Sequence, residues 1–173
     1  MKKILIIVFF VLLTFFGVGG HIVFAESSIN GDELKIEAQS VNPGDDYKYV
    51  LKRLKEKITL MILSLSSQKK ADFYVKLVGV RMSELKYVVD KKDIANIQTA
   101  SQRYAAASGE LTDFILRKNM VDYNEKVKNL FDSHILFLEK LRDTYPYVSS
   151  EWRFVQDDAN SLKSHISKLS EKR

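Results

Sequence analysis

The stretch from Ala71 to Val89, ADFYVKLVGVRMSELKYVV, decides the fold. Its apolar residues recur at alternating steps of four and three residues, which places them on one stripe of an α-helix. The stripe therefore predicts an amphipathic helix with one buried side. It comprises Ala71, Val75, Val78, Met82, Leu85 and Val89.

The same spacing occurs in one segment before this stretch and in three segments after it. The preceding stripe comprises Tyr47, Leu51, Leu54, Ile58, Met61 and Leu65. The first stripe that follows comprises Ile97, Ala100, Tyr104, Ala107, Leu111 and Phe114, and the second comprises Tyr123, Val127, Leu130, His134, Phe137 and Leu141. The last comprises Trp152, Val155, Ala159, Leu162, Ile166 and Leu169. No alternating strand pattern competes after residue 46. Residues 47–173 are therefore predicted to form an all-α antiparallel bundle of about five helices.

Short polar breaks separate the predicted helices. Ser66 and Ser67 connect the first two so briefly that we expect an antiparallel hairpin, with the apolar stripe of 47–65 packed on that of 71–89. The same pair offers an N-cap for the second helix. Asn119 is predicted to cap the fourth helix and Ser149 or Ser150 the fifth. The sequence leaves open whether the last helix, 149–171, packs or extends as an arm. It also allows coiled-coil assembly, although stripes of only about three heptads favour intramolecular packing.

Residues 1–25, MKKILIIVFFVLLTFFGVGGHIVFA, are typical of an export signal, with two lysines before an apolar run and a small-residue site at Val23 to Ala25. Cleavage after Ala25 predicts a periplasmic, secreted or cell-surface protein. The alternative is an uncleaved N-terminal membrane anchor, because the run approaches the ~20 residues that span a bilayer. The polar residues 26–46, which contain Gly31, Pro43 and Gly44, are predicted to be a flexible linker.

Composition excludes several kinds of site. The net charge of +5 includes Lys2 and Lys3, so a chain cleaved after Ala25 carries +3, too little for a nucleic-acid binder. The chain has no cysteine, which excludes disulfides, thiolate metal ligands and a lipid-modified cysteine. About 148 residues follow Ala25, enough for one domain with its own core.

No catalytic or metal-binding motif follows the predicted signal. Only His134 and His165 remain there, on separate helices and without the spacing of zinc or di-iron ligands. We therefore predict no cofactor, no metal and no enzymatic activity. The alternative is a ligand-binding or enzymatic bundle with an internal aromatic pocket, which would be lined by Tyr104, Tyr123, His134 and Phe137.

A cluster of basic residues on the first helix is the second candidate site. Lys52, Arg53, Lys55 and Lys57 are expected to face solvent, where they would meet an anionic envelope polymer or phospholipid headgroups. The alternative is that these four side chains form a solvated helix face that binds no partner. The function predicted from these residues is a non-enzymatic cell-envelope interaction module. Its partner would be an envelope protein or an anionic envelope polymer. The protein would contact a membrane only through an uncleaved signal segment or through this basic surface. The sequence does not predict the oligomeric state.

Three stretches of the sequence are similar to those of a known family. The segment NPGDDYKYVLKRLKEK at 42–57, followed by KKAD at 69–72 and RMSEL at 81–85, resembles the bacterial domain-of-unknown-function family numbered 5667. The resemblance covers roughly residues 43–116 and implies an exported or membrane-tethered helical domain that opens with a helical hairpin. It implies no activity, substrate or catalytic residue. The chain departs from the family pattern at Asp46, at Ser67-Gln68 and at Gly79.

Overall fold

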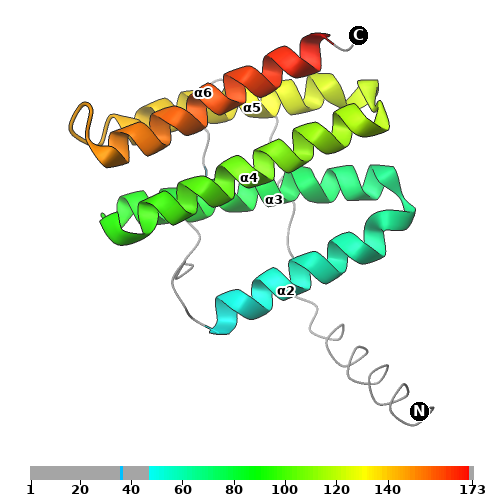
Figure 1. The fold of residues 1–173 in the computed structure, drawn as a ribbon, viewed down its shortest axis with the longest axis horizontal. Helices are drawn as coiled ribbons and strands as arrows, with labels where there is room; N and C mark the ends of the chain where they lie inside the picture. The colour runs from blue at the N-terminus through cyan, green and yellow to red at the C-terminus, as the bar shows by residue number, and fades with distance from the viewer. Residues whose placement is uncertain (1–35, 37–46, 172–173) are drawn as a thin grey trace. The chain divides into compact units, whose positions relative to one another are not determined.

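A computed structural model describes residue 36 and residues 47–171 of the chain. The predictions of a signal at 1–25 and a linker at 26–46 fall outside the described residues, apart from Ile36. The described part contains five α-helices and no strand: α2 (Tyr47–Ile62), α3 (Ser67–Asp90), α4 (Ile94–Lys118), α5 (Val121–Arg142) and α6 (Ser150–Glu171), with a short 3-10 turn, η1 (Leu63–Leu65), after α2 (Figure 1). The predicted all-α bundle is confirmed.

Four of these helices form the body of the bundle. α3 packs along α4, α5 packs along α6, and α4 and α6 join the two pairs. α2 lies apart from these four helices in Figure 1 and makes few close backbone contacts beyond its own 3-10 turn. The last helix, predicted either to pack or to extend as an arm, is part of the bundle.

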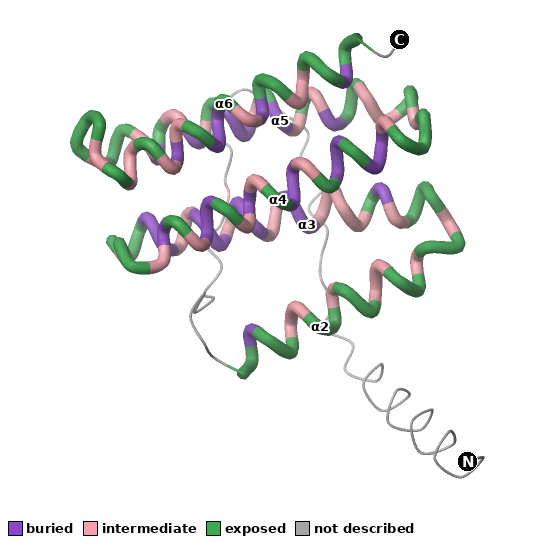
Figure 2. The backbone as a smooth tube through the Cα atoms, in the orientation of Figure 1, coloured by how far each residue is buried: buried purple, intermediate pink, exposed green. Residues whose placement is uncertain are grey.

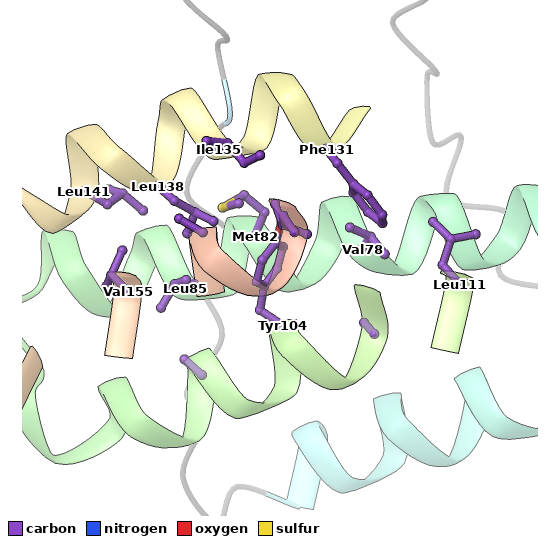
Figure 3. Close-up of a cluster of buried hydrophobic side chains, with 14 of the residues drawn as sticks. Val78, Met82, Leu85, Tyr104, Leu111, Phe131, Ile135, Leu138, Leu141 and Val155 are labelled. Atoms are coloured by element: carbon purple, nitrogen blue, oxygen red, sulfur yellow. The ribbon is translucent and has the colours of Figure 1, made fainter. Parts of the chain in front are cut away.

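The core is built from the predicted stripes of α3 to α6. Figure 3 shows side chains from all four helices meeting in one layer. Phe131 and Leu138, which α5 contributes to this layer, are fully buried. Burial of such side chains stabilises the fold by about 1.5–3 kcal/mol each. Other members include Val78, Met82 and Leu85 from α3, Tyr104 and Leu111 from α4, and Val155 and Leu162 from α6.

Two of the predicted helix caps are confirmed and one is wrong. The Ser66 hydroxyl accepts a hydrogen bond from the Lys69 backbone N–H, and the Ser149 hydroxyl accepts one from that of Trp152 at 3.1 Å. Both therefore act as N-caps. Asn119, predicted to begin α5, instead ends α4. Its φ of 51° is left-handed, a conformation that asparagine tolerates better than most residues.

Among residues 47–171, no helix is both long enough and apolar enough to cross a bilayer.

Candidate functional site

The apolar stripe of α2 faces outward, so the prediction that it packs on α3 is wrong. Figure 2 shows α2 as largely exposed, in contrast to the other helices, and Tyr49 is its one buried residue. Leu54 is 51% exposed and Met61 74%, and Leu65 in the following turn is 97% exposed. The remaining exposed apolar residues of this segment are Tyr47, Val50, Leu51, Ile58 and Ile62.

The physical reason lies in α3, whose apolar stripe is already covered. α4, α5 and α6 close the core over that stripe, and the side of α3 left for α2 carries Arg81 and Glu84. Both are almost fully buried. A buried charge needs an opposite charge, so the polar side of α2 is the side that fits.

A network of ion pairs attaches α2 to α3. Arg81 donates to Glu84 at 2.6 Å and to Glu56 of α2, while Lys52 of α2 donates to Glu84 at 2.7 Å. Arg53 also contacts Glu56, at 3.4 Å. Burial alone would lower the pKa of Arg81, but the neighbouring carboxylates of Glu84 and Glu56 raise it. Arg81 is therefore a charged anchor between the two helices.

The four predicted basic residues do not form one surface. Lys52 and Arg53 belong to the network that attaches α2 to α3, with 32% and 41% of their side chains exposed. Lys55 and Lys57 are exposed and make no ion pair within the described residues. The sequence pattern missed Arg81 and Glu84 as buried partners. Their i, i+3 spacing beside the α3 stripe was the available signal.

A groove of about 230 Å³ lies next to this network, lined by residues of α2, α3 and α4. Arg53 and Arg81 line it together with Arg103 of α4. The Arg103 guanidinium lies 4.3 Å from the centre of the Tyr49 ring, in a cation–π contact. Burial raises the pKa of Tyr49, and the charge of Glu84 adds to this effect. Glu110 lines the groove as well, and Arg53 and Arg81 are already engaged with carboxylates, so the groove does not form a free basic site.

Inside the bundle, Tyr104 and His134 meet as the aromatic-pocket hypothesis requires. The Tyr104 hydroxyl and the His134 Nδ1 share a hydrogen bond of 3.0 Å. Both side chains are buried, and burial lowers the pKa of His134 to about 4 while raising that of Tyr104. His134 is therefore neutral at pH 7 and satisfies the buried tyrosine hydroxyl, as expected of a packed histidine.

The other two proposed pocket residues do not complete a polar site there. Phe137 is partly buried and packs against the core. The Tyr123 hydroxyl donates to Asp72 of α3 at 3.0 Å, in an exposed contact. No group of three or more histidine, cysteine or carboxylate side chains that could hold a metal ion occurs in the described part of the chain.

Asp158 of α6 is a buried carboxyl that the sequence analysis did not single out. It is 2% exposed, and its Oδ2 atom has no hydrogen-bond partner. Burial raises the pKa of Asp158 to about 8. A hydrogen bond from Ser101 favours the ionised form and lowers this pKa, whereas the negative charge of Asp157 raises it. In the sequence, Asp158 directly precedes Ala159 of the apolar stripe of α6, and this position could have indicated a carboxyl near the core.

Comparison of the chain with protein-family profiles, curated proteins and solved structures finds no match.

Proposed function

We propose that this protein is a non-enzymatic interaction module of the cell envelope that docks through the outward face of α2. The observation that carries the proposal is a continuous apolar face on a helix whose opposite side is fixed to the bundle by ion pairs. Exposed apolar patches of this kind usually mark interaction sites in folded proteins. The export signal predicted at 1–25 supports the envelope location.

The attachment of α2 explains how such a face stays available. A helix held by its apolar stripe would have buried that stripe, whereas α2 is held through the pairs of Lys52 with Glu84 and of Glu56 with Arg81. Lost solvation of buried charges makes such pairs poor sources of stability compared with apolar packing. What the network adds is orientation, because it presents one defined side of α2 to the surroundings.

Photo-crosslinking in the producing cell tests the proposal. A benzoylphenylalanine placed at Leu54 should crosslink to another macromolecule or to lipid, because this position lies at the centre of the proposed surface. The matched control is Leu136 of α5, which is 63% exposed and therefore at least as open to solvent as Leu54. Equal crosslinking at Leu54 and Leu136, or none at Leu54, would contradict docking through α2.

A further inference from the structure

The exposed apolar residues of α2 form a broad arc. With about 3.6 residues per turn, Val50, Leu54 and Ile62 span roughly a third of the helix circumference. Tyr47 lies at the start of this arc and Leu65 follows its end, so the arc extends along the whole segment. A coiled-coil seam is narrower than this arc. A helix that lies in a bilayer surface presents a broad apolar face of this kind with basic residues beside it.

Lysines line both edges of the arc. Lys55 and Lys57 lie about 160° apart around the helix axis, one on each side of Leu54. The one acidic residue of α2, Glu56, points to Arg81 on the opposite side. The outward face is therefore apolar at its centre and basic at its edges, with no acidic side chain.

From this arrangement we infer that the outward face of α2 lies flat in the surface of a bilayer that contains anionic lipids. The apolar side chains would enter the acyl boundary, while the lysine stems extend along the apolar surface and bring their ammonium groups to the lipid phosphates. Tyr47 suits the headgroup level because its ring is apolar and its hydroxyl polar. The inference rests on the proposed function, and it names the partner of the same face.

The lysines at the edges of the arc favour a lipid surface over a second copy of the chain as the partner of α2. In an antiparallel pair of α2 helices, Lys55 would face its own counterpart and Lys57 would do the same, because equivalent edge positions meet. The outward face offers no carboxylate to neutralise them. Like charges opposed in this way destabilise the pair. A negatively charged surface removes the conflict.

A dye on residue 54 tests the inference in the full chain, which has no natural cysteine. The variant Leu54→Cys would carry an environment-sensitive nitrobenzoxadiazole group, and Leu136→Cys would serve as the matched exposed position. Vesicles of neutral phosphatidylcholine would be compared with vesicles that also contain phosphatidylglycerol. A dye at a chosen residue separates contact through α2 from insertion of residues 4–24.

We expect the dye at residue 54 to shift to the blue and to lose access to iodide several-fold on anionic vesicles, with a much smaller change on neutral ones. The dye at residue 136 should not respond. Adding Lys55→Glu and Lys57→Glu should remove most of the response at residue 54, because the edges then repel anionic lipid.

An absent response at residue 54, or equal responses on both vesicle types, would overturn the inference. Crosslinking of Leu54 to a protein in cells, combined with an absent vesicle response, would leave docking through α2 intact and assign the face to a protein with acidic edges. The absence of both signals would contradict the proposed function as well.

Discussion

Phe131→Ala should lower the free energy of unfolding by about 3–5 kcal/mol, whereas Leu54→Ala should change it by less than about 0.5 kcal/mol. Phe131 is fully buried among residues of the bundle core, so its truncation leaves a cavity. Leu54 is half exposed on the outward side of α2 and supports no neighbouring helix. Chemical denaturation of the two variants, compared with the parent chain, measures both effects.

The contrast separates two arrangements that the sequence alone does not distinguish. If the stripe of α2 were part of the core, Leu54→Ala would cost about 2–5 kcal/mol, like other large core truncations. A loss of that size at Leu54 would show that the outward assignment is wrong. Loss at Phe131 alone supports a core that α3 to α6 complete among themselves.

The stability of the protein should fall by roughly 1–1.5 kcal/mol between pH 6.5 and pH 8, because Asp158 is more easily protonated in the folded state than in the unfolded state. Burial raises the pKa of Asp158 from 3.8 to about 8. The folded chain holds a proton that the unfolded chain has released, so stability decreases as pH rises. The slope is about 1.4 kcal/mol per unit near pH 6.5 and becomes smaller as the pH approaches 8.

His134 has the opposite effect at lower pH. Its pKa is lowered from 6.5 to about 4 by burial, so the unfolded chain binds the extra proton and stability is lost as pH falls through this range. The two contributions roughly cancel between pH 4 and 6.5. Asp158 therefore dominates only above pH 6.5.

Asp158→Asn isolates the contribution of the carboxyl. The amide has nearly the same shape and does not ionise, so the variant should be more stable than the parent at pH 8 and should have a flatter profile above pH 6.5. Urea denaturation at half-unit steps of pH measures both profiles. Parallel slopes for parent and variant would show that Asp158 is ionised in the folded protein at pH 7.

The spacing of apolar residues predicted the fold because most of the predicted helices bury the side on which these residues lie. Val78, Tyr104 and Leu162 lie in the core as their spacing indicates. The same reasoning failed for α2, since spacing shows that Leu51 and Leu54 share a side without showing what covers it. Coverage depends on how α3 to α6 close around one another, which is a property of the assembled bundle.

The candidate site was harder to predict from sequence. The pairing of Lys52 with Glu84 joins residues 32 positions apart, and no local pattern specifies such a contact. The meeting of Tyr104 and His134 was anticipated because both lie on predicted core stripes. Asp158 was missed because a carboxyl beside an apolar stripe is usually at the edge of a helix and solvated.

The rate at which a thiol reagent modifies single-cysteine variants tests the outward orientation of α2 most directly. In a chain without natural cysteine, Leu54→Cys, Leu136→Cys and Leu138→Cys report on one position each. Residues 54 and 136 are similarly exposed and residue 138 is fully buried. We expect Leu54→Cys to react within a few-fold of Leu136→Cys, and Leu138→Cys to react at least roughly 100-fold more slowly, because it must wait for local opening. A Leu54→Cys variant as protected as Leu138→Cys would show that the apolar face of α2 is buried, and would contradict a docking surface on this helix.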